Sequence, residues 1–449
     1  MAPVQNSRSP TGRSPTGKYL SGYAEPEAAL VRDNIALSGR VYRHALVIPA
    51  CREQAADIQG VWQHLETAGL LVVVVVNSPS PGDPVTRSLL ATLSQGYRVH
   101  SADCVLFCTA EAARGGSKPD LLLVDRCTPG REIPARQGVG LARKIGCDIL
   151  VCLREMGLLE SRWIATTDAD AILPADYFSY SPASPEIAAI VHPFNHSPTT
   201  SALETPVALY ELHMLHYAAA LRWAGSPYGY PTIGSTIRCS AEHYARVRGF
   251  PKRNTGEDFY LLNKLRKTGL VQPADVAPVI IAGRLSDRVP IGTGQALGRI
   301  AAMEAPLTDF PFDHPGSFSS LKRLLSLLGD IAQGESDRTA EIELLAQDPE
   351  LGAFATSSGL LARIRSAASR QPAPAVMHKH LMDWFDALKT RQFIHWMRDH
   401  HYGSSDLNGL FEAGYVNLPA SQIQSALPET LAAWLGSRFY QMIYSADYA

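Results

Sequence analysis

Short apolar runs alternate with amphipathic segments through the first half of the chain. Residues 45–48, 70–77 and 121–124 are runs of this kind, and the run at 70–77 reads LLVVVVVN, with almost no polar position that could face water. Strands that are apolar on both faces are typical of parallel sheets covered by helices. Between these runs, apolar residues recur three or four positions apart, which predicts helices over residues 58–65, 85–93 and 139–153. The alternation predicts an α/β fold with a mostly parallel, doubly wound sheet.

The stretch at residues 163–178, WIATTDADAILPADYF, contains a further apolar run that ends in two acidic residues. A strand is predicted from residue 163 onward, and Asp168 and Asp170 follow it before Pro174 breaks the pattern. Two carboxylates one residue apart offer the hard oxygen ligands that Mg²⁺ or Mn²⁺ favours, above all when a substrate's phosphates complete the shell. The same pattern also fits a polar turn, because aspartate is common where a strand ends.

The loops that follow the predicted strands are expected to meet. In open α/β sheets, ligands bind outside the carboxyl ends of the strands. The segments concerned are residues 49–53, 77–84, 125–136 and 168–170. Their convergence predicts a ligand site at one edge of the sheet.

The second half of the chain first continues the α/β pattern and then becomes helical. Residues 187–191 and 279–282 are predicted strands, and residues 203–223 have the spacing of a long amphipathic helix. Beyond residue 304, strand-like runs become rare and helical spacing dominates. We therefore expect a catalytic domain over residues 41–304 and a mostly helical C-terminal region over residues 305–449.

The segment before the first strand has a different composition. It contains the repeat Arg-Ser-Pro-Thr-Gly twice, at residues 8–12 and 13–17. Serine, proline and glycine with scattered positive charge are typical of disordered segments. Residues 1–40 are therefore predicted to be a disordered or loosely ordered N-terminal arm. They lack the apolar core of a secretory signal.

Composition narrows the function classes. The chain has 449 residues, 46% hydrophobic and 19% charged, with a formal net charge of -2. These values are ordinary for a soluble globular protein and argue against nucleic acid as a partner. The longest apolar run is too short for a transmembrane segment. Seven cysteines without a C-x-x-C pair favour reduced thiols in a cytoplasmic protein over disulfides or a zinc site.

Four short motifs stand in order along residues 41–300. They are VIPACRE after the first strand, VVVVVN after the second, TTDADAILP, and a glycine-containing segment that ends in Gly256-Glu257-Asp258. In this order and spacing the chain resembles the family 2 glycosyltransferases, which have the GT-A fold. The resemblance implies transfer of a hexose from a nucleotide-diphosphate-sugar donor, linked to UDP or GDP, to an acceptor that the sequence does not name. It does not cover the N-terminal arm or the helical region.

The resemblance also implies a set of donor-binding positions. Pro49, Ala50 and Glu53 match the loop that wraps the nucleoside of the donor. Asn77 stands near the base, where the family usually has an acidic residue. Arg136 matches a segment that helps to hold ribose and phosphate.

Further positions concern the diphosphate and the metal. Arg143 or Lys144 could reach the diphosphate. Asp168 and Asp170 match the family's D-x-D motif, which binds the donor through Mn²⁺ or Mg²⁺, with Asp170 as the more direct metal ligand. Arg288 lies where related transferases often place a mobile loop over the donor, and a plain surface connection fits that segment equally well.

The chemistry of transfer calls for a base. A carboxylate that takes the proton of the attacking hydroxyl would assist transfer. The resemblance assigns this role to Asp258, with Glu257 as a contact to the acceptor. However, the residues from Thr255 to Asp258 also have the shape of a helix-capping arrangement, in which Asp258 would only favour the helix dipole. Inverting and retaining outcomes both remain open.

Two rival functions deserve a test. A sugar-1-phosphate nucleotidyltransferase shares the sheet type and the metal, but such enzymes resemble one another in a G-x-G-T-R loop where this chain has PACREQ. A binding module that has lost catalysis and works through its helical region is the second rival. The C-terminal helices are also compatible with a homo-oligomer.

Overall fold

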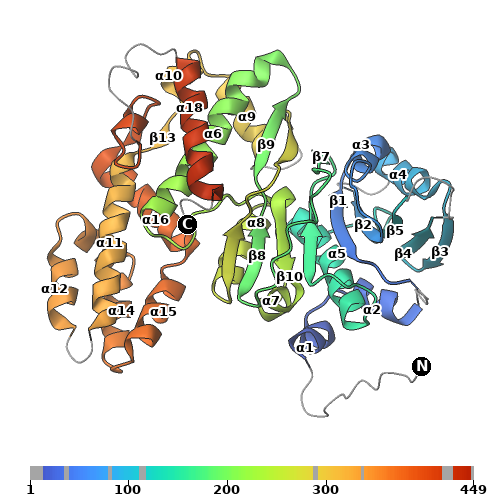
Figure 1. Ribbon diagram of the computed structural model, residues 1–449, viewed down its shortest axis with the longest axis horizontal. Coiled ribbons are helices and arrows are strands. Elements are labelled where there is room, and N and C mark those ends of the chain that lie inside the picture. The colour runs from blue at the N-terminus through green and yellow to red at the C-terminus, as the bar shows by residue number, and fades with distance from the viewer. Residues whose placement is uncertain are drawn as a thin grey trace. The chain divides into compact units, whose positions relative to one another are not determined.

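The computed structural model describes residues 14–34, 40–78, 83–110, 118–286, 292–334, 338–416 and 428–445. They fall into two compact units (Figure 1). The first comprises Met1–Asp170, Ala175–Ala189 and Ile237–Leu261, and the second comprises Ala171–Pro174, Ile190–Thr236 and Leu262–Ala449.

The first unit holds most of a large sheet, and the strands that it contributes, the last two residues of β8 excepted, run in the order β8-β10-β6-β1-β2-β5-β4-β3. Their bounds are β1 His44–Ala50, β2 Leu70–Asn77, β3 Arg98–Ala102, β4 Val105–Thr109, β5 Asp120–Arg126, β6 Trp163–Thr166, β8 Ile187–Val191 and β10 Ile237–Ser240. Strands β6, β1, β2 and β5 are parallel neighbours, as the uniformly apolar runs predict. By contrast, β10 pairs antiparallel with β6, and β3, β4 and β5 pair antiparallel in sequence. The sheet is therefore mixed rather than mostly parallel.

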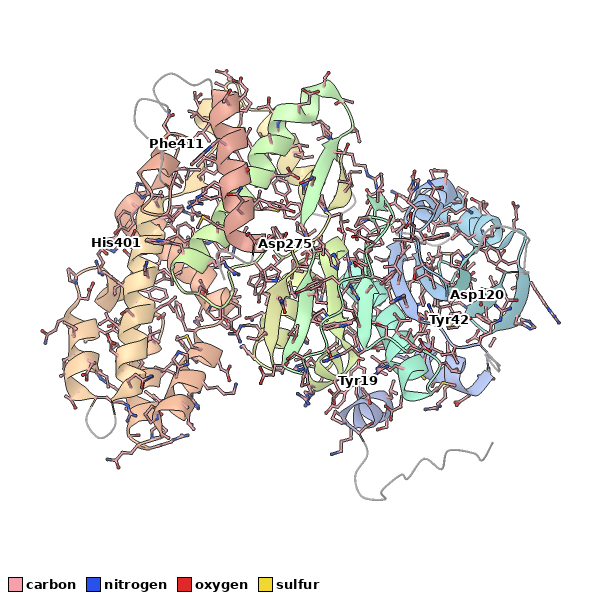
Figure 2. The ribbon with its side chains drawn as sticks, in the orientation of Figure 1. Tyr19, Tyr42, Asp120, Asp275, His401 and Phe411 are labelled. Atoms are coloured by element: carbon pink, nitrogen blue, oxygen red, sulfur yellow. The ribbon has the colours of Figure 1, made fainter. Side chains whose placement is uncertain are left out.

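The helices of this unit are α1 Pro15–Gly22, α2 Pro26–Asn34, α3 Ala55–Gly60, α4 Pro84–Ser94, α5 Gly138–Glu155, α7 Ala241–Arg246 and the first part of α8 Glu257–Arg266. The long helix α5 packs on β1, β2 and β6. Gly146 permits this close packing, because a Cβ atom at that position would overlap the side chain of Val47. At the start of β5, Asp120 lies beside Tyr42 (Figure 2). The Tyr42 hydroxyl and the Arg40 guanidinium each donate to the buried Asp120 carboxylate over 2.6 Å.

The N-terminal segment differs from its prediction. Residues 15–34, expected to be loosely ordered, form α1 and α2, which contact α5. Tyr19 of α1 (Figure 2) is 2% exposed. Its hydroxyl donates to Asp148 of α5 at 2.5 Å. Lys144 of α5 completes the group, with its ammonium 2.6 Å from the Tyr19 hydroxyl and 2.8 Å from Asp148. This buried network, and not local composition, orders the segment.

The second unit combines a small sheet with many helices. Its strands are β7 Ala171–Ile172, β9 Phe194–Pro198, β11 Leu270–Pro273, β12 Val279–Gly283, β13 Phe312–Asp313 and β14 Ser404–Ser405, and β12 lies between β7 and β9. Its α-helices are α6 Glu204–Trp223, α9 Thr293–Ala301, α10 Pro306–Asp309, α11 Pro315–Gln333, α12 Thr339–Gln347, α13 Leu351–Ser357, α14 Leu360–Ala368, α15 Pro374–Trp384, α16 Ala387–Met397 and α18 Pro428–Tyr444. The strong helical spacing beyond residue 304 is thus confirmed as helix.

Helix α6 forms the centre of the second unit. It contacts α18, α9, α10 and α11 (Figure 1). His216 on its buried face shares a 2.8 Å hydrogen bond with the hydroxyl of Tyr415, so this histidine has a packing role. Because α6 precedes residue 304 and α18 follows it, the C-terminal helices belong to the same compact unit as residues 190–236. A domain boundary at residue 304 is not what the contacts show.

Two sequence-based expectations bear on the environment of the protein. All seven cysteines are free, and six of them are buried. Among the helices that the structure describes, none is long and apolar enough to span a membrane.

Candidate active site

The carboxyl ends of the four parallel strands lie at one edge of the sheet. Ala50 at the end of β1 pairs with Val76 of β2, and Asn77 at the end of β2 pairs with Arg126 of β5. On the other side of β1, Val47 pairs with Thr166, the last residue of β6. Since neighbouring strands are about 4.8 Å apart, β6 lies roughly 10 Å across the sheet from β2. Thr166 is level with Val73, so β6 ends four residues before β2 does. The four parallel strands therefore end toward one edge, as predicted, and the meeting of their loops in one site stays a prediction.

Asp168 follows β6 at this edge and contacts Arg143 of α5. The Arg143 guanidinium lies 2.5 Å from its Oδ1 atom. Arg143 also donates to the Thr166 hydroxyl over 2.9 Å, so its orientation is set at two points of the same segment. The arginine side chain is 4% exposed, whereas the Asp168 side chain is 36% exposed. Asp168 therefore presents a carboxylate to solvent while a buried cation holds it from behind.

The second acidic motif reaches the same arginine. Glu257, the first residue of α8, pairs with Arg143 at 3.2 Å and is buried. Asp258 follows it and is half-buried, with its Oδ1 atom accepting the N–H of Phe259 over 2.7 Å. Burial alone would lower the pKa of Arg143, but the charges of Asp168, Glu257 and Asp258 raise it above its usual value. The carboxylates of two motifs 90 residues apart thus surround one guanidinium.

Two glycines at the start of α5 bring the motifs together. The Gly140 N–H donates to the Arg253 carbonyl over 2.9 Å, which joins α5 to the segment that leads into α8. A Cβ atom at Gly140 would lie only 2.5 Å from that same oxygen and would also overlap the Pro251 carbonyl. Gly138 likewise touches Asn254, where a Cβ would come within 2.8 Å of the backbone. The Gly-Val-Gly pattern therefore serves close packing of α5 against residues 251–254.

Gly140→Ala is expected to destabilise the fold by about 1–3 kcal/mol, the usual range for overpacking, since backbone carbonyls cannot move aside as a side chain can. Denaturant unfolding measures the loss. Gly329→Ala is the matched control, because a Cβ added at that helical glycine meets nothing within 4 Å. If both variants unfold at the same denaturant concentration, the close approach at Gly140 is not a constraint on the fold.

Glu257 is the titratable group of this site. Burial raises its pKa from 4.5 to about 7, the Asp258 charge adds to the rise, and the Arg143 guanidinium opposes it. A folded-state pKa above the unfolded value means that the folded state binds the proton more tightly. Its contribution to stability is therefore complete below pH 4.5 and is lost as the pH rises through about 7.

A Glu257→Gln variant tests this sign. The unfolding free energy of the wild type minus that of the variant should fall by up to about 1.4 kcal/mol per pH unit across that window. Denaturant titrations at several pH values give the two curves. For Glu186→Gln, which removes an exposed carboxylate, the curve of unfolding free energy against pH should be parallel to that of the wild type. Parallel curves for Glu257→Gln would instead mean that this carboxyl titrates normally.

The predicted nucleoside-binding residues lie along the same edge. Pro49 and Ala50 are the last two residues of β1, with Pro49 half-buried and Ala50 buried, and Glu53 in the following turn is buried as well. The Oδ1 atom of Asn77 is buried and has no hydrogen-bond partner among the residues that the structure describes. Arg136 is exposed, two residues before α5 begins.

Two other predicted residues are not brought to this group. Lys144 follows Arg143 on α5, and its ammonium contacts Tyr19, the Tyr23 carbonyl and Asp148 instead. Successive helical residues point about 100° apart, so one of the pair faces the site and the other faces the N-terminal helices. Arg288 lies outside the described residues.

Sequence reasoning missed Thr166 and the role of residues 251–254. Thr166 was part of the TTDAD motif, but a hydroxyl one position inside a strand gave no sign that it would orient an arginine. The pair Gly138 and Gly140 did carry a signal, because two glycines at a helix start often mark close backbone approach. In the described part of the chain, no group of three or more His, Cys, Asp or Glu side chains is placed to hold a metal ion.

Comparisons with known proteins add little to this geometry. No protein-family model matches the chain, and no curated protein sequence matches it. Among solved structures, the crystal structure of S. aureus TarS residues 1–349 in complex with UDP-GlcNAc aligns with 10% identity and a TM-score of 0.33, covering 90% of this chain and 91% of that one. A second crystal structure of S. aureus TarS residues 1–349 aligns with 10% identity and a TM-score of 0.33, covering 76% of this chain and 90% of that one. The crystal structure of S. aureus TarS aligns with 11% identity and a TM-score of 0.30, covering 76% of this chain and 55% of that one. At such TM-scores we draw neither fold nor activity from these likenesses.

Proposed function

We propose that the protein is a glycosyltransferase of the family 2 type that moves a hexose from a nucleotide-diphosphate-sugar donor to a hydroxyl acceptor. The observation that supports this most is the position of Arg143, which pairs with Asp168 of one acidic motif and Glu257 of the other. Two motifs chosen from sequence order alone thus meet at the carboxyl edge of the parallel strands, where α/β sheets bind ligands.

The donor would lie across the ends of β1 and β2. Pro49, Ala50 and Glu53 border the nucleoside, and the buried Oδ1 atom of Asn77, without a partner among described residues, suits an N–H donor on the base. Uracil and guanine both offer such a group, as do the amino groups of adenine and cytosine, so the contact is compatible with a UDP- or GDP-linked donor but does not select it. The exposed Arg136 is free to approach the diphosphate. For Arg288 the same role rests on sequence alone.

The residues at this edge fit a divalent ion. Arg143 contacts Oδ1 of Asp168, whose side chain is 36% exposed. Asp170 is half-buried two residues on. Mg²⁺ is commonly bound by one or two carboxylates together with substrate phosphates, so a full protein cage is not required. Asp168 and Asp170 would hold Mn²⁺ or Mg²⁺, which when bound would neutralise charge on the departing diphosphate.

The remaining chemistry falls to the chain's own groups. Asp258 would take the proton of the acceptor hydroxyl as the oxygen attacks the anomeric carbon and the bond to the diphosphate breaks. Arg143 would contribute fixed positive charge beside the leaving group through its position at Asp168. Glu257 would contact the acceptor side of the site and hold Arg143 in place. The free thiols support a cytoplasmic setting.

Asp170→Ala tests the proposal directly. With Mn²⁺ and UDP- or GDP-sugars, the wild type should release nucleoside diphosphate, and the variant should lose about 10²-fold or more of that turnover. Its melting temperature should change little, because a half-buried loop carboxylate contributes little to the core. Asp176→Ala, an exposed aspartate six residues on, is the matched control. Undiminished turnover in Asp170→Ala would remove the metal assignment.

The same assay separates the rival functions. Exchange of labelled pyrophosphate into a nucleotide-sugar would identify a nucleotidyltransferase. Tight donor binding in calorimetry with no release of nucleotide would identify a binding module. A homo-oligomer through the C-terminal helices is a separate proposal, which sedimentation analysis can test.

A further inference from the structure

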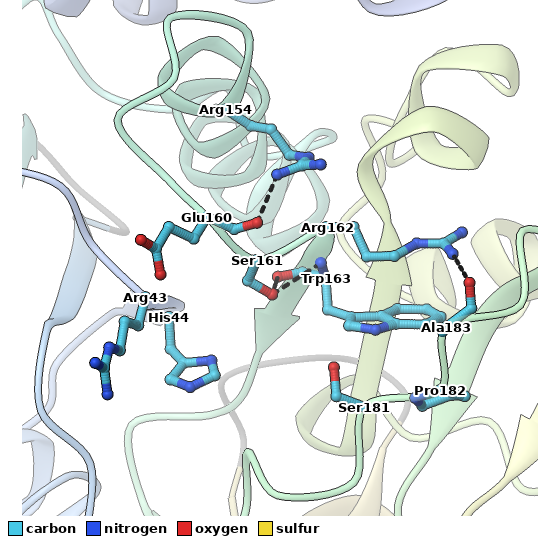
Figure 3. A pocket seen from close by; sticks show the side chains of 10 residues that line it. All are labelled: Arg43, His44, Arg154, Glu160, Ser161, Arg162, Trp163, Ser181, Pro182 and Ala183. Carbon is cyan, nitrogen blue, oxygen red and sulfur yellow. Dashed lines mark hydrogen bonds between the residues drawn. The ribbon is translucent and has the colours of Figure 1, made fainter. Parts of the chain in front are cut away.

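A cavity of roughly 460 Å³ lies in the first unit where β1 and β6 begin (Figure 3). His44 opens β1 and Trp163 opens β6, so the cavity is at the amino edge of the parallel strands. The candidate active site is at their carboxyl edge. The volume is within the range of small-molecule sites, about 300–1,000 Å³.

The strand register sets which side chains share this face of the sheet. Leu46 pairs with Ala165, and Ala165 pairs with Arg238. Directly paired residues and residues two positions apart point to the same side. His44, Trp163 and Arg238 therefore share one face. Helix α5 covers the opposite face, where Gly146 meets Val47.

The lining of the cavity is positively charged. Arg43, Arg154 and Arg162 line it, together with a single carboxylate, Glu160. None of the three arginines makes an ion pair within the described residues. The three positive charges therefore exceed the single negative charge of Glu160.

Two of the arginines are held in place. The Arg154 guanidinium donates to the carbonyls of Leu159 and Glu160, at 3.2 and 2.7 Å. The Arg162 guanidinium donates to two carbonyls of the facing loop, those of Ala183 and Ser184, each at 3.0 Å, and stacks 5.0 Å above the Trp163 ring (Figure 3). Backbone carbonyls orient a guanidinium without neutralising it. The positive charge is fixed in position before any ligand arrives.

A fully buried cation lies behind the cavity wall. Arg238 is 0% exposed and donates to the carbonyls of Tyr177 and Tyr180, the latter next to the cavity residue Ser181. Its guanidinium also lies 5.5 Å from the Phe178 ring, on which His44 stacks. Its Nε and Nη2 atoms have no hydrogen-bond partner, and it makes no ion pair, in the described part of the chain. A buried charge without a counter-charge is costly, and a nearby anion would lower that cost.

We propose that this cavity binds a small phosphate-bearing ligand. Guanidinium groups match phosphate oxygens in charge and in planar geometry, better than they match a single neutral acceptor. The cavity offers room for a phosphate with a small organic part. The formal net charge of -2 gives no global attraction for a large polyanion. The site is independent of the proposed transferase reaction, because it uses other residues at the other edge of the sheet.

Calorimetry with the full chain tests the site, using inorganic phosphate and glucose 6-phosphate as probes at low ionic strength. Replacing Arg43 and Arg154 by glutamine should weaken binding of the better probe by at least about tenfold, the loss of 1.4 kcal/mol in binding free energy. Glu160→Gln should strengthen it. Arg246→Gln removes another exposed arginine of the same unit and should leave the affinity unchanged.

The outcomes divide clearly. Tighter binding of glucose 6-phosphate than of phosphate, lost in the Arg43 and Arg154 variant, identifies a phosphorylated metabolite as the ligand. Equal affinities lost in that variant identify free phosphate. Affinity that is unchanged in a folded Arg43→Gln/Arg154→Gln variant, or no binding to the wild type, overturns the proposal. Since Asp170→Ala should not affect this binding, failure here is distinguishable from failure of the transferase.

Discussion

Asp258→Asn is expected to reduce glycosyl transfer by about 10²–10⁴-fold, the usual contribution of a positioned general base. Asparagine keeps the size of the side chain and an oxygen that can still accept the Phe259 N–H, which Asp258 accepts at 2.7 Å. It removes the negative charge of the side chain and, with it, the ability to take up a proton. The hydrogen bond at the start of α8 is therefore preserved and the proposed chemical role is lost, while loss of the charge near the helix dipole should cost only about 0.3–1 kcal/mol of stability.

The measurement is kcat and the donor Kd of the same preparation. If Asp258 is the base, kcat falls and donor affinity changes little. Equal losses in transfer and in donor binding, or a fall in melting temperature large enough to explain the lost activity, would favour the capping role instead. Asp176→Asn supplies a control of the same chemical change at an exposed position.

Asp148→Asn is expected to destabilise the protein by about 3–5 kcal/mol, the cost of breaking a buried ion pair from one side. The Lys144 ammonium is 2.8 Å from Asp148 and has 5% side-chain exposure, so it would remain buried with only the partly buried Glu25 carboxylate, 3.7 Å away, as a counter-charge. Burial raises the pKa of Asp148, and Lys144 opposes that rise, which indicates that the pair is mutually dependent. The Tyr19 hydroxyl would also lose its charged acceptor.

Denaturant unfolding of a double-mutant cycle isolates the pair. Lys144→Met in the Asp148→Asn background should lower the unfolding free energy by less than Lys144→Met alone, because the double variant has no unpaired buried charge from this pair. Additive losses would mean that the two groups contribute independently. Far-ultraviolet circular dichroism would show in addition whether α1 and α2 remain helical.

The central sheet was predictable where burial is complete. β2 has the predicted bounds, residues 70–77, because every position from Leu70 to Val76 is apolar and buried in the folded chain. The hairpin of β3 and β4 was missed. β3 reads RVHSA and is largely exposed, so it carries neither the alternation nor the apolar content that marks a strand.

The candidate site was predictable in its residue types but not in its pairings. The acidic motifs stood out, yet no pattern in the sequence says that Arg143 turns toward Asp168 while Lys144 turns away. That choice depends on the tilt of α5 over the sheet and on what packs behind it. For the same reason the sequence could not predict that residues 15–34 fold into two packed helices. Their stability comes from Asp148, more than a hundred residues away.

Helix α5 carries adjacent residues with separate attachments, Arg143 to the acidic motifs and Lys144 to Tyr19 of the first helix. A substitution in residues 19–25 that displaces α5 should therefore lower the proposed activity, although no atom of that segment need contact a substrate. Variants collected there are best grouped with those of the D-x-D segment when their phenotypes are interpreted.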